Sequence, residues 1–444
     1  MPDAAAGRGE VAEEECYCLF VLGTRPEAIK LVPLVQAMER SRIVPLIVDT
    51  GQHPDMVPKI LDLAGVAPDF QLNVASPGAS IIRTSEKLMA GLEDVLDTLR
   101  GGPERRAAPR LFSGVGSKAG RYPAMVVVQG DTVSAQIGAQ VAAMNRLLVV
   151  HVEAGLRTGD RWNPFPEEIN RLVIGQLASL HLPPTWMSAQ ALVREGFDVR
   201  QMLVTGNTGV DAILWAAGLD LPWPDPRLDR LDTHEGQVVA ATMHRRENWG
   251  GGITRIAEGL ATIAAARPDV LVVLPMHPNP KVRESIEPVL GGLDNVILVE
   301  PLEYPAFAKL LKRADLAISD SGGVQEEAPS LGTPVLVTRE SSERMEGVTE
   351  GVLELVGTDP MRISSVALRL LDDPSELAAM TSRANPFGDG HASERIVSAL
   401  EYLVFGGTPP VAFGSPFDRL RVLTEAGYSS AEVRAVLSGA YRRS

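Results

Sequence analysis

Seven short stretches of this sequence place His, Arg, Asp or Glu beside Gly or Pro, directly after an apolar run. They are Gly23–Lys30, Thr50–His53, Gln129–Thr132, His151–Asp160, Met243–Asn248, Met276–Pro280 and Ser319–Gly323. Charged side chains next to residues that let a backbone approach closely are typical of ligand-binding loops. Loops also carry such residues for solubility alone, but seven of them in one chain favour a binding or catalytic site.

The stretch Ser319–Gly323 (SDSGG) indicates a site for an anionic group. A glycine pair at the start of a helix exposes backbone N–H groups to a bulky anion, and Ser321 adds a hydroxyl donor. Glu326 and Glu327 would repel a phosphate directly above them, but a carboxylate there can accept from ribose hydroxyls. We interpret the stretch as part of a nucleotide site; a helix that is merely well capped is the alternative. The stretch lacks the G-K-[S/T] of the loop that binds nucleoside triphosphates and the G-x-G-x-x-G of the loop that binds dinucleotides.

The elements that position these residues follow from the apolar pattern. Strand-like runs in the first half are CYCLFVLGT, IVPLIVDTG, AMVVVQGDT and LLVVHVEAG, and in the second half QVVAATMH, DVLVVLPMH, NVILVE, DLAISDSGG and PVLVTRE. Continuous apolar strands that alternate with helices predict an α/β fold with parallel sheets covered on both faces. Ligands of such sheets bind beyond the carboxyl ends of the strands, where the seven stretches lie.

Length and composition limit the classes of protein. The chain has 444 residues, 45% hydrophobic and 22% charged, which predicts two domains of a soluble globular enzyme. A net charge of −14 argues against nucleic-acid and anionic-membrane partners. Since no apolar run approaches about 20 residues, we expect no membrane span. Cys16 and Cys18 are interpreted as buried thiols of a cytoplasmic protein, with no metal bound.

Six ordered motifs together resemble the non-hydrolysing UDP-N-acetylglucosamine 2-epimerases. They are GTRPEAIK, GDT, HVEAGLRTGD, PEEINR, HRREN and DSGGVQEEAPSLGTPVLV, and the resemblance extends from Leu19 to Phe405. It implies a glycosyltransferase-B-like fold with two Rossmann-like domains, a cleft between them that holds the active site, and a homodimer. It also implies reversible C2 epimerisation of UDP-N-acetylglucosamine (UDP-GlcNAc) to UDP-N-acetylmannosamine (UDP-ManNAc), a step of cell-surface polysaccharide biosynthesis. UDP would leave to give 2-acetamidoglucal and then re-add, without any cofactor.

The resemblance and the composition divide the chain into five parts. We expect a disordered leader at 1–16, an N-terminal Rossmann-like domain at 17–205 and a C-terminal Rossmann-like domain at 206–390. A helix at 391–405 is expected to cross back to the first domain, and 406–444 reads as a helical extension. The polar, Gly/Arg-rich segment 100–123 is predicted to be a surface loop.

By resemblance, the acid/base carboxylates are Asp131, Glu153 and Glu167 in the N-terminal domain. His244 is implied to lie near the diphosphate and to contribute to catalysis. For Asp131 a turn or N-cap role stays open, because Thr132 follows it. Glu168 is the alternative to its neighbour Glu167.

The substrate and UDP contacts are also implied by the resemblance. They are Arg25, Lys30, Arg245, His277, Phe307, Ser321, Gly322, Gly323, Glu327 and Arg344. Arg25 and Lys30 would hold phosphate and sugar, Phe307 would stack on uracil, and Glu327 would bind the ribose. A lysine at the position of Lys30 is, taken alone, more often a solvated helix residue, and a core aromatic would look the same as Phe307 from sequence. Met345 replaces the proline of the family's Arg-Pro-Glu sequence.

Many bacterial family members also bind UDP-GlcNAc as an activator next to the active site. Gln52 and His53 correspond to that region. Asp55 interrupts the usual Gln-His-x-x-Gln pattern, and Gly78 stands where some members have arginine. We therefore expect weak activation or none.

Other functions stay open at this point. A hydrolysing 2-epimerase would release ManNAc and UDP, and a related enzyme could act on a UDP-diacetamido-sugar uronate. A glycosyltransferase of the same fold would bind a UDP-sugar in the same way, although three carboxylates in the first domain favour the epimerase. A nucleotide-sugar-binding protein without catalysis is a further alternative.

Overall fold

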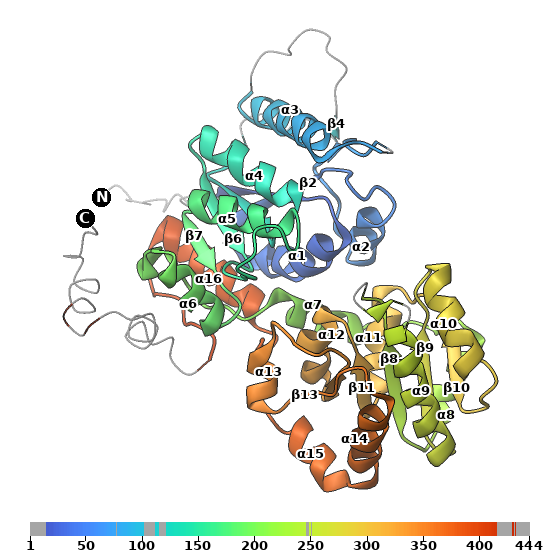
Figure 1. The fold of residues 1–444 in the computed structure, drawn as a ribbon. Helices are drawn as coiled ribbons and strands as arrows, with labels where there is room; N and C mark the ends of the chain where they lie inside the picture. Colours follow the sequence, from blue (N-terminus) through green and yellow to red (C-terminus); the bar gives the residue numbers. More distant parts are fainter. Residues whose placement is uncertain are drawn as a thin grey trace, which may run out of the picture. The chain divides into compact units, whose positions relative to one another are not determined.

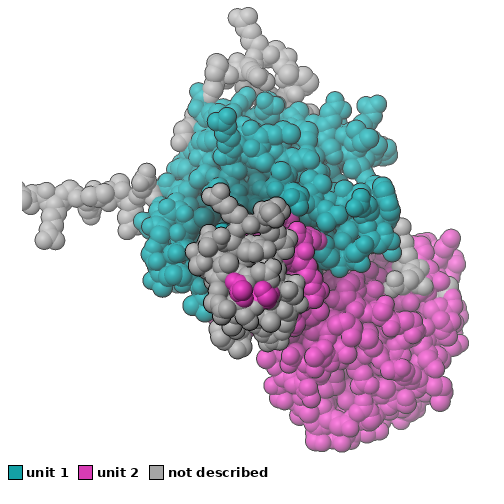
Figure 2. Space-filling model, turned by 60° about the vertical axis from the view of Figure 1, so that its left-hand side comes forward, with its two compact units in different colours: residues 1–182, 200–203, 394–411 teal, residues 183–199, 204–393, 412–444 magenta. Residues whose placement is uncertain are grey.

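The computed structural model describes residues 15–76, 78–101, 112–114, 121–245, 248–249, 251–414, 429 and 431 (Figure 1). These residues form two compact units, shown in separate colours in Figure 2. Unit 1 comprises the described residues within 1–182, 200–203 and 394–411. Unit 2 comprises those within 183–199, 204–393 and 412–444. Most of the predicted leader and most of the predicted C-terminal extension lie outside the described residues.

In the described part of unit 1, seven strands form one sheet in the order β4-β3-β2-β1-β5-β6-β7. The strands are β1 (Cys16–Leu22), β2 (Ile43–Asp49), β3 (Phe70–Leu72), β4 (Phe112–Gly114), β5 (Met125–Gln129), β6 (Leu148–Val152) and β7 (Leu180–Leu182). All neighbouring strands pair in parallel except β3 and β4, which are antiparallel. Strand β4 lies within the segment 100–123 that we expected to be loop, and the residues around it lie outside the described chain.

Helices cover both faces of the unit 1 sheet (Figure 1). They are α1 (Arg25–Ala37), α2 (Val57–Leu63), α3 (Ile81–Leu99), α4 (Val133–Met144), α5 (Glu167–Leu177) and α16 (Ala392–Phe405), with a 3-10 turn, η1 (Met38–Arg40). Apolar side chains of α3, α4 and α5 form one buried cluster with alternate residues of the strands, such as Leu19 and Val21. Helix α16 contacts the residues just before β2: Ser41 Oγ donates to Glu401 at 2.8 Å, and the Arg42 guanidinium lies 3.8 Å from the Phe405 ring centre.

In the described part of unit 2, six strands, all parallel, follow the order β10-β9-β8-β11-β12-β13. They are β8 (Val238–Thr242), β9 (Leu271–Pro275), β10 (Val296–Val299), β11 (Leu316–Ser319), β12 (Val335–Val337) and β13 (Leu353–Leu355). This order, together with the parallel pairing in both units, confirms the prediction of two Rossmann-like α/β domains.

Unit 2 also contains several helices within its described residues. They are α6 (Trp186–Arg194), α7 (Thr208–Ala217), α8 (Arg230–Thr233), α9 (Gly251–Ala266), α10 (Pro280–Leu290), α11 (Tyr304–Arg313), α12 (Gly322–Glu327), α13 (Met345–Glu350), α14 (Pro360–Asp372) and α15 (Pro374–Thr381). The 3-10 turns of unit 2 are η3 (Pro226–Asp229) and η5 (Ala328–Leu331). A further 3-10 turn, η2 (Val199–Gln201), begins with Val199 of unit 2 and continues with two residues of unit 1. The strands and helices α9, α10 and α14 share one apolar core.

Two expectations about the whole chain can be compared with the structure. Within the described ranges, no helix combines the length and apolar character that a bilayer span requires. Cys18 is buried as expected, whereas Cys16 is half-buried at the first residue of β1, and both are reduced thiols.

Candidate active site

A pocket of about 500 Å³ in unit 1 contains the three carboxylates that the resemblance singles out. Its lining residues are Thr24, Pro26, Lys30, Gln52, His53, Ile81, Gln129, Gly130, Asp131, Thr132, Val133, Glu153, Pro166, Glu167 and Asn170. Thr24, Gln129 and Glu153 mark the carboxyl ends of β1, β5 and β6. Parallel strands therefore bring together motifs that lie more than a hundred residues apart.

Glu153 adopts a backbone conformation that is unusual for its residue type. Its φ is +64°, in the left-handed region, which costs a non-glycine residue about 1–3 kcal/mol. Lys30 Nζ donates to both carboxylate oxygens, at 2.8 Å and 2.6 Å, and Gln129 Nε2 donates to Oε2. The Glu153 side chain is 8% exposed. These contacts hold the Glu153 carboxylate at the pocket in a strained but defined position.

Asp131 is paired with an arginine that the sequence analysis did not select. Arg171 Nη2 lies 2.6 Å from Asp131 Oδ2, and Arg171 Nε donates to the same oxygen at 2.8 Å. Asn170 Nδ2 donates to the Asp131 carbonyl at 2.8 Å. Thr132, rather than Asp131, caps α4, because its Oγ1 accepts from Ala135 N. The N-cap alternative for Asp131 is therefore wrong.

The adjacent glutamates at the start of α5 have different environments. Glu168 is buried, pairs with Arg171 Nη1 at 2.9 Å and accepts from Thr158 N and Gly159 N. Glu167 lines the pocket, and no hydrogen-bond donor among the described residues contacts its buried Oε2. Of the two, Glu167 is therefore the one at the pocket, and its Oε2 is engaged by no donor among the described residues.

A fourth carboxyl group, Glu27, was missed in the sequence analysis. It is fully buried, its Oε2 accepts from Gly23 N at 3.0 Å and Thr24 N at 2.8 Å, and Thr132 Oγ1 donates to its Oε1. Burial raises the pKa of Glu27 to about 7, although these hydrogen bonds act in the opposite direction. The Thr-x-x-Glu spacing at 24–27 is a capping pattern that could have drawn attention to it.

A buried histidine supports the turn that carries Asp131. His151, on β6, has its Nε2 2.8 Å from the carbonyl of Gly130. Burial lowers the pKa of His151 to about 4, so the ring is neutral near pH 7 and its Nε2–H can donate to that carbonyl.

Three predicted residues of unit 1 remain to be placed. Gln52 and His53 line the same pocket as the carboxylates, and Gln52 Oε1 accepts from Ser134 Oγ at 2.8 Å. Arg25 is the first residue of α1 and is half-buried, but it is not among the residues that line the pocket.

In unit 2, Asp320 organises the loop that follows β8. This fully buried carboxylate accepts from His244 N at 3.1 Å, Arg245 N at 3.0 Å and Asn248 Nδ2 at 3.0 Å. His244 Nδ1 lies 3.4 Å from Asp320 Oδ1. Burial lowers the pKa of His244, while the charge of Asp320 works against that shift. The rings of His244 and His277 are stacked with centroids 6.3 Å apart.

Two arginines lie beside the glycine pair that begins α12. A Cβ at Gly322 would lie 3.0 Å from Cζ and 3.1 Å from Nη2 of Arg344, and 3.2 Å from Nη2 of Arg245. Helix α12 has six residues, so its dipole is small, and the guanidinium groups supply most of the positive charge there. Ser321 is the N-cap residue, and its N–H donates to Ser319 Oγ at 3.0 Å.

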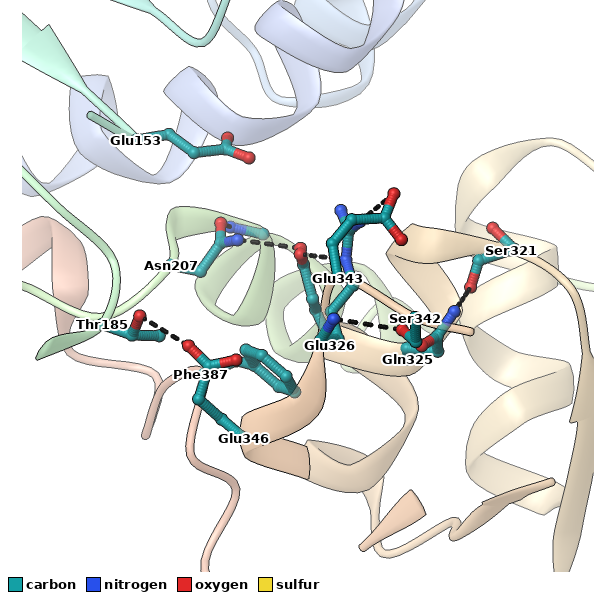
Figure 3. Close-up of polar contacts among 12 residues, drawn as sticks. Glu153, Thr185, Asn207, Ser321, Gln325, Glu326, Ser342, Glu343, Glu346 and Phe387 are labelled. Atoms are coloured by element: carbon teal, nitrogen blue, oxygen red, sulfur yellow. Dashed lines mark hydrogen bonds and ion pairs between the residues drawn. The ribbon is translucent and has the colours of Figure 1, made fainter. Parts of the chain in front are cut away.

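Glu326 and Glu327 also differ in their surroundings. Glu326 is buried and pairs with Arg344. It also accepts a hydrogen bond from Asn207, as Figure 3 shows. Glu327 is half-buried, and its Oε1 lies 3.7 Å from the Cβ position of Gly323. Phe307 lies on α11 and is half-buried.

Within the described chain, no group of three or more His, Cys, Asp or Glu side chains is arranged to hold a metal ion.

The two Rossmann-like units, with their carboxylate pocket and their arginine-lined Gly-Gly turn, define a glycosyltransferase-B-like α/β protein. The family model described as UDP-N-acetylglucosamine 2-epimerase matches residues 118–401. The UDP-N-acetylglucosamine 2-epimerase of Salmonella typhimurium is 39% identical over 389 residues, which cover 86% of this chain and 98% of the relative. The chain belongs to the UDP-N-acetylglucosamine 2-epimerase family.

Solved structures agree with this assignment. The crystal structure of a protein from Listeria monocytogenes, described as a putative UDP-N-acetylglucosamine 2-epimerase, matches with a TM-score of 0.81 and 34% identity. The match covers 90% of this chain and all of that one. The UDP-GlcNAc 2-epimerase of Neisseria meningitidis, solved with UDP-GlcNAc bound, matches with a TM-score of 0.72 and 33% identity over 87% of this chain and 99% of that one.

Proposed function

We propose that this chain is a non-hydrolysing epimerase that interconverts UDP-GlcNAc and UDP-ManNAc at C2. The observation that carries the proposal is the pocket of unit 1, where Asp131, Glu153 and Glu167 line one cavity. The Neisseria meningitidis relative, whose structure contains UDP-GlcNAc, supports the choice of substrate.

The C2 proton of an N-acetylhexosamine is weakly acidic because C2 is not next to a carbonyl group. The proposed route therefore couples removal of that proton to cleavage of the C1–O bond. The C2–H electron pair becomes the C1=C2 double bond of 2-acetamidoglucal, and UDP departs with the C1–O electron pair. Re-addition of UDP to C1 and of a proton to the opposite face of C2 completes the epimerisation. The sequence is redox-neutral, so we expect no nicotinamide requirement.

The contacts of each carboxylate suggest a role for it. Lys30 and Gln129 stabilise the anionic form of Glu153, which suits it to accept the C2 proton. Glu167, whose buried oxygen has no donor among the described residues, is suited to carry the proton that returns to C2. Asp131 is oriented by Arg171 and would assist proton transfer. For the reverse reaction the two glutamates exchange roles.

We assign UDP to unit 2. Arg245 and Arg344 would bind the diphosphate beside Ser321–Gly323 and stabilise the charge that develops as it departs. His244 would assist there, and His277 would contribute to the nucleotide contacts. Glu327 would accept from the ribose hydroxyls and Phe307 would stack on uracil. Arg25 would contact phosphate or sugar.

Further parts of the proposal concern the cellular setting. We propose a cytoplasmic homodimer whose product enters cell-surface polysaccharide biosynthesis. Light scattering of the purified protein tests the oligomeric state, and a mass of one chain would rule out the dimer.

The experiment that tests the proposal is NMR of the products formed from UDP-GlcNAc in deuterated water. A mixture of UDP-GlcNAc and UDP-ManNAc, with deuterium at C2 of the newly formed epimer, is expected. Free ManNAc and UDP would identify a hydrolysing enzyme. No deuterium at C2 in the absence of any acceptor would reject the elimination route.

A further inference from the structure

The arginine that we assign to the diphosphate is held by a buried carboxylate from the neighbouring helix. Glu326 Oε1 lies 2.8 Å from Arg344 Nε. Glu326 Oε2 accepts from Asn207 Nδ2 at 2.9 Å (Figure 3). Asn385 Nδ2 donates to the Glu326 backbone carbonyl at 2.8 Å. Glu326 is 4% exposed. Both oxygens of this carboxylate are thus engaged by donors from other parts of unit 2, which gives the side chain a defined orientation.

A second set of hydrogen bonds fixes the backbone of the Arg344 loop to the same helix. Ser342 Oγ donates to Gln325 Oε1 at 2.6 Å and accepts from Arg344 N at 3.1 Å. Gln325 is fully buried, and its Nε2 donates to the Ser321 carbonyl at 3.1 Å. The loop and the turn at Ser321 are therefore connected through one amide side chain. Gln325 sets where the loop lies, and Glu326 sets where its guanidinium group points.

The guanidinium that results lies directly beside Gly322. Its Cζ is 3.0 Å from where a Cβ of Gly322 would be, and Arg245 Nη2 is 3.2 Å from the same point. Arg344 Nη1 also lies 3.1 Å from Glu343 Oε1, which is more exposed than Glu326 and also pairs with Arg339. Both guanidinium groups approach the same point, so their charges repel each other, and the carboxylate of Glu326 offsets part of that repulsion at Arg344.

We propose that Glu326 is a positioning residue for diphosphate binding: with Asn207 behind it, it holds the Arg344 guanidinium beside Gly322 before the ligand arrives. The inference rests on the proposed function, because it takes Arg344 to be a diphosphate ligand. A planar guanidinium binds phosphate oxygens well only in the correct orientation. Ordering it in advance removes part of the entropic cost of binding.

The test compares nucleotide affinities of Glu326→Gln and the unaltered protein by calorimetry. Glutamine has one acceptor and one donor at this position, so it cannot accept from both Arg344 and Asn207. We expect the Kd for UDP to rise about tenfold, in line with loss of a hydrogen bond to a charged group. The Kd for uridine should not change, a selectivity that general loosening of unit 2 would not produce.

The matched control is Glu354→Gln, which removes one of the two carboxylate partners of Arg369 at a more exposed ion pair of unit 2. It should leave the affinity for UDP unchanged. Asn207→Asp is a second variant, since it keeps the Oδ1 that accepts from Gly209 N but removes the donor to Glu326. This variant too should raise the Kd for UDP more than the Kd for uridine. It keeps the inference testable if Glu326→Gln does not fold.

Arg344→Ala separates failure of this inference from failure of the proposed function. If Arg344→Ala weakens UDP binding but Glu326→Gln and Asn207→Asp do not, Glu326 has no positioning role. The assignment of UDP to unit 2 is then still supported. If Arg344→Ala leaves UDP binding unchanged, the diphosphate assignment itself is wrong. If Glu326 acts through Arg344, the double variant Arg344→Ala/Glu326→Gln should bind UDP no more weakly than Arg344→Ala alone.

Discussion

Lys30 Nζ lies 2.8 Å from Oε1 and 2.6 Å from Oε2 of Glu153, so that one ammonium group engages the whole carboxylate. Both side chains line the same pocket. The resemblance assigns Lys30 to phosphate and sugar, and in the structure its ammonium has a partner that belongs to the acid/base group. The ammonium of Lys30 therefore stabilises the carboxylate form of Glu153.

Lys30→Met is predicted to lower kcat by roughly ten- to a hundredfold, the range for a hydrogen bond to a charged group. Without the ammonium, the buried Glu153 side chain loses the cation that stabilises its carboxylate form. The affinity for UDP, measured by calorimetry, should stay the same. Lys59→Met, at an exposed site on α2, is the control. A large loss of UDP affinity with unchanged kcat would instead assign Lys30 to the phosphates.

Asp131→Asn should abolish turnover while UDP binding persists. Loss of a group that takes part in proton transfer costs about 10²–10⁴-fold in rate. The neutral amide also cannot form the ion pair with Arg171. Asp62→Asn, an exposed change in unit 1, should retain full activity. Normal epimerisation by Asp131→Asn, followed by NMR, would remove this carboxylate from the mechanism.

Glu27→Gln tests the buried carboxyl group by the pH dependence of stability. The folded-state pKa of Glu27 is raised from 4.5 to about 7, mainly by burial. Its contribution to stability is therefore complete below about pH 4.5 and is lost as the pH rises through 7. The difference in unfolding free energy between the unaltered protein and the variant should fall by on the order of 3 kcal/mol between pH 4.5 and 8. Urea titrations at several pH values measure it, and a difference that does not vary with pH would contradict the prediction.

Gly322→Ala should weaken UDP binding by about tenfold or more. The new methyl group would lie about 3 Å from the guanidinium groups of Arg344 and Arg245, so both would have to move. Gly292→Ala is the matched control, because no atom lies within 4 Å of the Cβ position there. Equal UDP affinity for the Gly322 and Gly292 variants, measured by calorimetry, would show that the two arginines do not hold the nucleotide.

UDP-GlcNAc is expected to activate the reaction weakly or not at all. Gln52 and His53, the residues of the expected activator region, line the carboxylate pocket itself, and Gln52 is engaged by Ser134. The reaction started from pure UDP-ManNAc should therefore proceed without a lag in coupled assays. A reaction that stalls until catalytic UDP-GlcNAc is added would refute the prediction.

Much of the framework could be predicted from the sequence. The two parallel sheets follow from apolar runs and helical segments in alternation, and the carboxyl ends of β1, β5 and β6 carry the residues that line the pocket. Strand β4 could not be predicted, because three residues in a polar segment give no periodic signal.

The partners of the site residues were harder to predict than the site residues themselves. Arg171 lies 40 positions from Asp131, and Thr132 lies 105 positions from Glu27, so only the folded chain joins them. The pairs Glu167/Glu168 and Glu326/Glu327 pose another problem. Neighbouring helix positions point about 100° apart, so one member of each pair is buried in an ion pair and the other is more exposed, and composition alone does not tell which.

The left-handed backbone at Glu153 implies a conflict between thermal stability and catalytic activity. Glycine is the residue that this conformation favours, so any improvement of the protein for heat resistance alone would tend to erase the side chain that the reaction needs. In laboratory evolution of this chain for thermal stability, the variants of every round should therefore also be screened for turnover.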